Sequence, residues 1–271
     1  MAVAVKGDAV YAEERQERVE ALIAESGRVS VIDLAREFAV TSETVRRDLA
    51  QLEQRGLLRR VHGGAVASTN TSRAETDIVQ RRDLNAAAKE RIALAAMTFV
   101  PPSFSGAIAI DAGTTTGLFA EHIARWTPDA PHQVLVVITN SISIAAIVSI
   151  NTHVEVQLLG GRLRGITGAA VGASTLAQLA RLRPDIVFIG TNGVHAEFGF
   201  STPDDDEAAV KSALTRSARR TIALVDASKH GEVALVRFAD LSDIDTLITD
   251  GELSSTLAAA LTEADVEVLV A

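Results

Sequence analysis

The sequence predicts an α/β protein of two domains: a small helical domain at the N-terminus and a larger, mostly parallel α/β domain after it. The chain has 271 residues, more than a typical single domain, and 47% of them are apolar, enough to bury a large core. The apolar residues first follow a helical period, and later form short β-branched runs that alternate with Ala-rich helical stretches. We place the N-terminal domain at 11–66, a polar linker at 67–84, and the C-terminal domain at 85–271.

Composition excludes several classes of protein. The chain has no cysteine, so neither a disulfide framework nor a thiolate metal cluster can form, and a reducing compartment is expected. The N-terminal segment becomes charged too early for a signal peptide. The longest uncharged apolar run, 134–150, is interrupted by five Thr, Asn and Ser residues, which is untypical of a membrane span. We therefore expect a soluble, cytoplasmic protein that has no membrane partner.

The charge of the chain does not by itself indicate a nucleic-acid partner. The formal net charge is -9, and residues 1–72 hold ten basic and eleven acidic side chains. Both parts of the chain would repel a polyanion at long range, so binding would need a focused basic surface. Residues 41–65 offer such a surface, because they contain five arginines and three acids.

Two helices are predicted before this basic stretch. The first ends near Gly27, a usual helix terminator, and its apolar face holds Val19, Leu22 and Ile23. The second is predicted by "SVIDLAREF", in which Ser30 begins the helix and Asp33 follows three residues later, close to a capping box. Four residues of this helix are available for burial: Ile32, Leu34, Ala35 and Phe38.

The basic stretch predicts a third helix that begins after Thr41, a good N-cap. One narrow apolar stripe faces the core and consists of Val45, Leu49 and Leu52. The opposite face carries Glu43, Arg46, Arg47, Ala50 and Gln54. An apolar stripe on one side and arginines on the other are typical of a recognition helix, whose N-terminal residues enter the major groove of DNA.

A basic hairpin is predicted directly after this helix. The helix stops at Gly56, and "LLRRVHGGA" then gives an extended run with two arginines and a Gly-Gly turn, as in the wing of a winged helix-turn-helix. The alternative is a solvated amphipathic helix with an ordinary hairpin after it. The preceding helix and turn, the adjacent arginines and the glycine-tipped hairpin favour DNA binding. The predicted DNA-contacting residues are Thr41, Ser42, Glu43, Thr44, Arg46, Arg47, Arg59, Arg60 and His62.

Seven strands are predicted in the C-terminal domain, and most are separated by a helical segment. They span 107–111, 134–139, 154–160, 185–190, 221–226, 246–250 and 266–271. This alternation is typical of a mostly parallel sheet. We expect ligands to bind in the crevice beyond the carboxyl ends of its strands.

A candidate anion site follows the first of these strands. In "DAGTTTG", a glycine and three threonines stand between a strand and a helix, where backbone N–H groups, hydroxyls and the helix dipole can meet one anion. The same loop can equally be a tight turn. Polar residues also follow other strands: Thr139 and Asn140, Gly160 and Gly161, 191–193, and Asp226 with Ser228 and Lys229. Each alone is ordinary loop chemistry, but their recurrence at one edge indicates a small polar ligand.

A further pair lies in "DEAAVK", where Glu207 and Lys211 are four residues apart on a predicted helix. One interpretation is a surface ion pair of little energetic weight. The other is that Lys211 or Lys229 faces an anionic ligand while Glu207 bonds its hydroxyls.

The stretch "GRVSVIDLAREFAVTSETVRRDLAQLEQRGLLRRVHGGA" resembles the N-terminal winged helix of DeoR-family bacterial transcriptional regulators. The resemblance implies that Thr44, Arg46 and Arg47 belong to the recognition helix. It also implies that Asp48 orients a neighbouring arginine and does not touch DNA.

The resemblance extends to the C-terminus through "DAGTTT", "TN", "LLGG", "GTNGV", "DEAAVK" and "DASK", which occur in the order expected of the DeoR effector domain. That domain is similar in fold to ribose-5-phosphate isomerase and related sugar-phosphate enzymes. Within the family, the sequence is most similar to the branch that regulates sugar uptake and phosphotransferase genes. The resemblance therefore makes fructose phosphates the first effectors to test. The implied effector-binding residues are Asp111, Gly113, Thr114, Thr115, Thr139, Asn140, Gly161, Asn192, Glu207, Lys211 and Lys229.

These patterns predict a homo-oligomeric repressor, a dimer or a tetramer, that binds operator DNA and is released by a phosphorylated sugar. The alternative is a sugar-phosphate isomerase or deaminase with an appended DNA-binding module, for which Glu207, Asp226 and Asp111 are the candidate acids and bases. No Gly-x-Gly-x-x-Gly follows a predicted strand, and the six histidines lack ligand spacing, so we expect no nucleotide cofactor and no metal.

Overall fold

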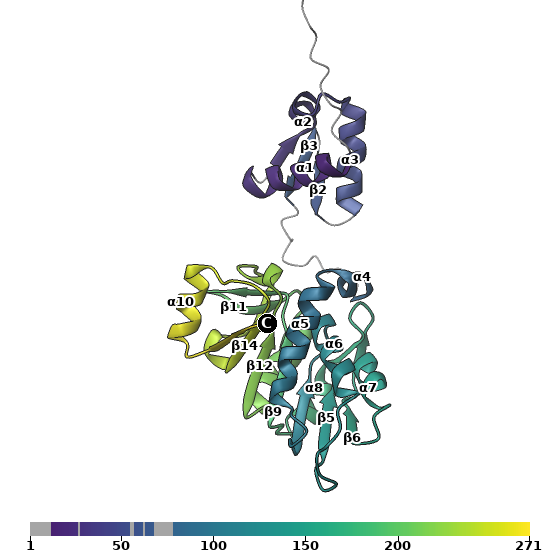
Figure 1. Ribbon diagram of the computed structural model, residues 1–271, viewed down its shortest axis with the longest axis vertical. Helices are drawn as coiled ribbons and strands as arrows, with labels where there is room; N and C mark the ends of the chain where they lie inside the picture. The colour runs from purple at the N-terminus through teal and green to yellow at the C-terminus, as the bar shows by residue number, and fades with distance from the viewer. Residues whose placement is uncertain (1–11, 27, 55–56, 62, 68–77) are drawn as a thin grey trace, which may run out of the picture. The chain divides into compact units, whose positions relative to one another are not determined.

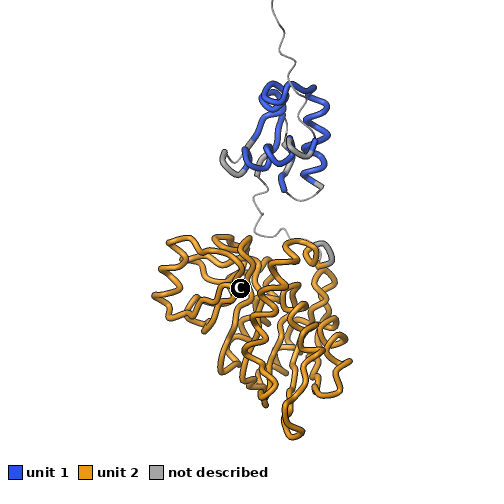
Figure 2. The backbone as a smooth tube through the Cα atoms, in the orientation of Figure 1, with its two compact units in different colours: residues 1–71 blue, residues 72–271 orange. Residues whose placement is uncertain are grey.

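The computed structural model describes residues 12–26, 28–54, 57–61, 63–67 and 78–271 (Figure 1). The chain divides into two compact units, residues 1–71 and 72–271 (Figure 2), and each is described by itself. Among the described residues, no helix is long and apolar enough to cross a membrane.

The first unit is a winged helix-turn-helix, as predicted. Its elements are α1 (Ala12–Ser26), β1 (Arg28–Ser30), α2 (Val31–Glu37), α3 (Ser42–Gln54), β2 (Leu58–Val61) and β3 (Gly64–Ala67). The strands form one antiparallel sheet in the order β1-β3-β2, in which β2 and β3 make the hairpin of the wing. The predicted N-cap is confirmed, because the Thr41 hydroxyl accepts a hydrogen bond from the Thr44 amide at 3.2 Å.

The three helices that the structure describes in the first unit share one apolar core. The stripe predicted on α3 is fully buried, with Leu52 completely inaccessible to solvent. One predicted core residue is wrong: Ile32 is 66% exposed, and Val31 is buried in its place. The reason is the phase of α2, which starts at Val31 because the Ser30 hydroxyl accepts the Ile32 amide. A shift of one residue turns a helical side chain by roughly 100°.

The second unit is built on a seven-stranded sheet in the order β15-β14-β12-β9-β4-β5-β6, and every pairing in it is parallel. All seven predicted strands belong to this sheet, so the predicted architecture is confirmed. Their bounds are β4 (Gly106–Ile110), β5 (Leu135–Thr139), β6 (Val154–Leu158), β9 (Ile186–Gly190), β12 (Arg220–Leu224), β14 (Thr246–Thr249) and β15 (Glu267–Val270).

Helices cover both faces of this sheet, and each face has its own apolar core. Residues of α5 (Ala86–Ala96), α6 (Thr114–Ile123) and α7 (Ile142–Val148) pack on one face. The ring centroids of Phe119 and Phe188 lie 4.2 Å apart in this core. Residues of α8 (Ala173–Leu179), α9 (Asp205–Ser217) and α10 (Ser255–Glu263) pack on the other. Strand residues alternate between the two cores, as Ile108 and Ala109 do on β4.

Several smaller elements were not predicted. A hairpin joins β7 (Arg162–Arg164) to β8 (Ala169–Val171), and a three-stranded antiparallel sheet joins β10 (Gly193–His195), β11 (Gly199–Thr202) and β13 (Val236–Ala239). Three short 3-10 helices span Met97–Phe99, Ala227–Lys229 and Leu241–Asp243. In addition, the segment 67–84, expected as a linker, contains the helix α4 (Ile78–Asp83), which contacts α6.

Candidate DNA-contacting helix and effector site

The outward face of α3 carries the predicted arginines. Glu43, Arg46 and Arg47 are exposed, and Arg46 lies 3.7 Å from Glu43. Arg47 has neither a hydrogen bond nor an ion pair with any described residue. Its guanidinium is therefore available for a partner outside this unit, and a bidentate contact to guanine is the usual one for such an arginine.

The inward face of α3 is tied to α1 by polar pairs. Asp48 is buried and accepts from Arg15 of α1, with Nε and Oδ2 2.9 Å apart. Gln16, the residue after Arg15 on α1, donates to Gln51 of α3 at 2.6 Å. The arginine that Asp48 orients thus comes from another helix, and the pair fixes the rotation of α3 about its own axis relative to α1.

The wing is tied to the same helix. Arg60 of β2 approaches Glu53 of α3 twice: its backbone amide donates to Oε1 at 2.9 Å, and its Nε donates to Oε2 at 2.6 Å. These two bonds, the backbone one first, hold the pKa of Glu53 below its usual value. Arg60 therefore anchors the wing, a role that the sequence did not predict. His62 and the side chain of Arg59 lie outside the described residues.

The order in which the chain adds strands to the C-terminal sheet reverses at β4. From β4 the chain proceeds to β5 and β6 on one side, and then returns to β9 on the other side of β4. In parallel sheets the crevice beyond the carboxyl ends of two such strands is the usual ligand site. Asp111, at the end of β4, and Gly190, at the end of β9, meet at this point.

Lys211 joins the two strand ends from α9. Its Nζ donates to the Asp111 carboxylate and to the Gly190 carbonyl, the latter at 2.8 Å, and both side chains are buried. Burial raises the pKa of Asp111, and the charge and hydrogen bond of Lys211 act against this rise. Lys211 and Asp111 thus satisfy each other at the carboxyl ends of β4 and β9.

Glu207 stands one turn before Lys211 but has other partners. It accepts hydrogen bonds from Thr167 and from Arg164, the latter at 3.1 Å, both on the β7–β8 hairpin. Asp204, the N-cap of α9, lies 3.2 Å from the same arginine. The interpretation of Glu207 and Lys211 as a surface ion pair is therefore wrong, since both are buried and each binds a different element.

Other predicted effector residues hold the loops in shape. Asn140 accepts from the Ala112 amide and donates to the Ala170 carbonyl, each at 3.2 Å. Thr139 accepts from the amide of Ser141 at 3.0 Å, and Asn192 accepts from the hydroxyl of Thr202 at 3.1 Å.

Gly161 is required by packing. A Cβ there would lie 2.1 Å from the Thr175 hydroxyl and 2.8 Å from the Val171 carbonyl. No larger side chain fits this position unless its neighbours move.

The loop "DAGTTTG" at 111–117, predicted above as an anion site and named below the predicted phosphate loop, borders a cavity of about 220 Å³. Its walls come from α4, α6 and α7 and from the turns before α6 and α7: Ile78, Arg82, Gly113, Thr114, Gly117, Leu118, Glu121, Ser141, Ser143, Ile144 and Ile147. Gly113, the N-cap of α6, has no side chain to satisfy the first amides of that helix, and no other side chain among the described residues does so. Thr115 is buried, as is Thr116, whose hydroxyl has no hydrogen-bond partner among the described residues.

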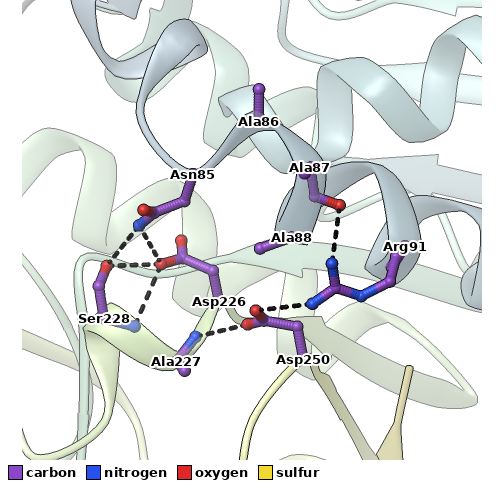
Figure 3. A pocket seen from close by; sticks show the side chains of 9 residues that line it. All are labelled: Asn85, Ala86, Ala87, Ala88, Arg91, Asp226, Ala227, Ser228 and Asp250. Carbon is purple, nitrogen blue, oxygen red and sulfur yellow. Dashed lines mark hydrogen bonds and ion pairs between the residues drawn. The ribbon is translucent and has the colours of Figure 1, made fainter.

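A second, more open cavity of about 430 Å³ lies at the start of α5 (Figure 3). It is lined by Asn85, Ala86, Ala87, Ala88, Arg91, Asp226, Ala227, Ser228 and Asp250. Figure 3 shows Asn85 donating to Asp226 and Ser228, and Arg91 pointing toward Asp250. Nη2 of Arg91 lies 3.2 Å from Oδ2 of Asp250. Lys229 does not line it.

The residues of the second cavity were only partly anticipated. Asp226 and Ser228 followed a predicted strand, whereas Asn85, Arg91 and Asp250 went unnoticed. The one available signal was an asparagine directly before an alanine run, a position from which Asn85 adopts a left-handed conformation with φ 55°.

Two sequence models match the chain. The DeoR-like helix-turn-helix domain matches residues 15–71, and the DeoR C terminal sensor domain matches residues 84–251. The chain is 37% identical over 225 residues to an uncharacterized HTH-type transcriptional regulator FruR of Bacillus subtilis, covering 83% of this chain and 85% of that one. It is 36% identical over 242 residues to the HTH-type transcriptional regulator GlpR of Haloferax volcanii, covering 89% and 91%.

More distant similarities extend in two directions. The glycerol-3-phosphate regulon repressor of Escherichia coli is 28% identical over 242 residues, covering 89% of this chain and 92% of that one. Among solved structures, ribose 5-phosphate isomerase A of Methanocaldococcus jannaschii is similar at 16% identity with a TM-score of 0.37, covering 54% of each chain.

Proposed function

The chain belongs to the DeoR family of transcriptional regulators, and from this premise we propose that it represses genes of sugar uptake or catabolism and leaves its operator when it binds a phosphorylated sugar. The DNA-binding half of the proposal rests on α3. Its outward face presents Arg46 and Arg47, and its inward face is held by the buried Arg15–Asp48 pair. A rigidly held helix with exposed arginines suits base recognition in the major groove.

The observation that carries the effector half is the start of α6. It lies after β4, at the point where the order of the strands reverses, and it combines uncapped amides with Gly113, Thr114 and an adjoining cavity. Helix N-termini of this kind favour phosphate. Relatives named as glycerol-3-phosphate regulon repressors also support a phosphorylated effector. Fructose phosphates are the first candidates.

We propose that the C-terminal unit senses its ligand and does not turn it over. Isomerisation requires a general acid and a general base that can approach the substrate. The three candidate carboxylates are each engaged: Asp111 by Lys211, Glu207 by Arg164 and Thr167, and Asp226 by Asn85 and Ser228. Such contacts favour a structural role for all three.

The proposal includes the remaining predicted features. A regulator of transcription acts where the chromosome is, so we place the protein in the cytoplasm. We also propose that it is a homo-oligomer, because two winged helices bound to one operator allow an effector to alter affinity by changing their arrangement.

Operator release tests the proposal directly. The operator is first selected by the protein from random duplexes, and its complex is followed by fluorescence anisotropy. We expect fructose 1-phosphate, fructose 6-phosphate or another member of a sugar-phosphate panel to release the DNA, while the matching unphosphorylated sugar does not. A complex that no phosphorylated sugar of the panel dissociates would contradict the proposal. If the protein turns over a sugar phosphate of the panel and Glu207→Gln abolishes that turnover, the alternative of an enzyme is correct.

A further inference from the structure

Helix α4 forms one wall of the cavity at the predicted phosphate loop. Ile78 and Arg82 line it from α4, while Gly113, Thr114, Gly117 and Leu118 line it from the start of α6. In the chain, α4 is the first described element after residues 68–77, which connect it to the DNA-binding unit. The cavity therefore joins the predicted phosphate loop to the helix nearest in sequence to the winged helix.

Among the described residues that line this cavity, Arg82 and Glu121 are the two that carry a charge. They form an ion pair across α4 and α6, with Arg82 Nη2 2.6 Å from Glu121 Oε1. The Arg82 side chain is 62% exposed, and an ion pair so open to solvent contributes little to stability. Arg82 can thus exchange this carboxylate for a phosphate at low cost in free energy.

The start of α6 has donors without a side-chain partner among the described residues. No described side chain caps the first amides of α6, beside which Thr114 lines the cavity. The buried Thr116 hydroxyl on the same turn does not itself line the cavity, and it has no partner among the described residues. That hydroxyl would lie 3.0 Å from a Cβ added at Gly113, so it is close to the loop. Unsatisfied donors at a helix start and an arginine facing the same space are the chemistry that binds a phosphate. Leu118, Ile144 and Ile147 offer an apolar surface to the rest of the ligand.

Helix α4 is also bonded at its two ends to other parts of the second unit. The Ile78 amide donates to the Ile166 carbonyl at 3.2 Å, in the turn of the hairpin whose Thr167 donates to Glu207. Near the other end, the buried Lys89 of α5 donates to the Arg81 carbonyl. A shift of α4 must change these contacts.

We propose that the phosphate of the effector binds in this cavity between Arg82 and the first turn of α6, and that Arg82 leaves Glu121 to bind it. Effector binding then shifts α4, and this shift is the step that lowers operator affinity. The inference rests on the proposed function, and it adds a ligand residue, Arg82, and a mechanical link that no predicted site residue supplies.

Arg82→Gln in the full chain tests the ligand role. By titration calorimetry with inorganic phosphate, and with whichever fructose phosphate releases the operator, affinity should fall about tenfold or more, since one charge-assisted contact is lost. Arg82→Lys keeps the charge and should recover part of the loss. The matched control is Arg125→Gln, which removes an exposed arginine just past the other end of α6 and should bind like the wild type.

Glu121→Gln tests the exchange of partners and should act in the opposite direction. Without its carboxylate, Arg82 is already available, so phosphate affinity should rise several-fold and operator release should need less effector. Glu90→Gln is the control, because it removes an equal charge from α5, where Glu90 pairs with His122 of α6 at 2.9 Å. A merely structural pair would not give opposite effects for its two members.

Hydrogen exchange tests the movement of α4. Phosphate should change the exchange rates of the α4 amides in the wild type and not in Arg82→Gln. If the wild type binds the sugar phosphate and releases DNA while Arg82→Gln does both equally well, only the role of Arg82 is wrong. If the wild type neither binds a sugar phosphate nor releases DNA, the proposed function itself fails.

Discussion

Nε of Arg15 on α1 lies 2.9 Å from Oδ2 of Asp48 on α3, and both side chains are buried. Each of two charges removed from water in this way offsets the other, so the loss of either one is costly. The pair therefore links the fold of the winged helix to the orientation of its recognition helix.

Asp48→Ala should destabilise the first unit by about 3 kcal/mol, because it leaves a buried arginine without its carboxylate. The chain has a single tryptophan, Trp126, and it lies in the second unit. In urea unfolding, circular dichroism should therefore show earlier loss of helix while the Trp126 fluorescence transition stays in place. Glu43→Ala, which removes the exposed partner of Arg46, is the control and should cost under about 0.5 kcal/mol.

Arg47→Ala should reduce affinity for the selected operator by about tenfold or more and leave non-specific DNA nearly unaffected, because the loss is of base contacts. Arg60→Ala removes a basic side chain of the wing together with its bond to Glu53, so it should weaken both DNAs about equally and reduce the salt slope by roughly 1. Anisotropy titrations over a range of salt measure both. Arg18→Ala, on α1, is the control. Unchanged affinities in both the Arg47 and the Arg60 variant would contradict the assignment of α3 and the wing as the DNA-contacting elements.

Lys211→Met should make stability depend on pH through Asp111. Burial already raises the pKa of Asp111, and the pKa rises further when the opposing charge of Lys211 is removed. The folded chain then binds this proton more tightly than the unfolded chain, so the loss of stability is small below the unfolded pKa and grows as pH rises through the folded pKa. We expect a deficit of about 3 kcal/mol at neutral pH that shrinks toward pH ~4.

Urea unfolding followed through Trp126 at several pH values measures this deficit. The double variant Asp111→Asn with Lys211→Met should recover much of the loss at neutral pH, because no buried charge is then left unpaired. A deficit that is the same at every pH would show that packing of the lysine stem, and not the charge of Asp111, is responsible.

The parallel sheet could be predicted because buried strands are continuous apolar runs bounded by turn residues. The β7–β8 hairpin could not, since its strands are three residues long and its sequence, "RLRGITGAAV", has no apolar alternation. Pairing of charges was the weakest point. Lys211 has Glu207 four residues away in the sequence, but its partner in the fold is Asp111, 100 residues away.

The candidate site could also be predicted only in part: its local features follow from the sequence, but its long-range contacts do not. That Asp111, Gly113 and Thr114 stand at a strand end and a helix start is a local property, and the sequence predicts it. Which of them face a cavity depends on the helix that covers them, and α4 lay in a segment that was expected to be a linker. Arg82 went unnoticed for that reason.

Gly161→Ala should cost about 2 kcal/mol, because a methyl group there overlaps the Thr175 hydroxyl and the Val171 carbonyl. Thr175 cannot easily move, since it is buried and donates to the Gly160 carbonyl at 2.9 Å. Gly165→Ala, in the turn of the hairpin, meets nothing within 4 Å and should change stability by under about 0.5 kcal/mol. Equal unfolding midpoints for the two variants would contradict the packing role of Gly161.

Gly117→Ala should affect stability and effector binding in opposite directions. Gly117 lies inside α6, and a Cβ added there meets nothing within 4 Å, so alanine should stabilise the helix by up to about 1 kcal/mol. The same methyl group occupies part of the cavity of about 220 Å³ that Gly117 lines. More effector should then be needed for operator release, although the protein unfolds at higher urea. Ser255→Ala, exposed on α10 over the other face of the sheet, should leave the release concentration unchanged. If Gly117→Ala gains stability and keeps the wild-type release concentration, the effector does not bind in this cavity.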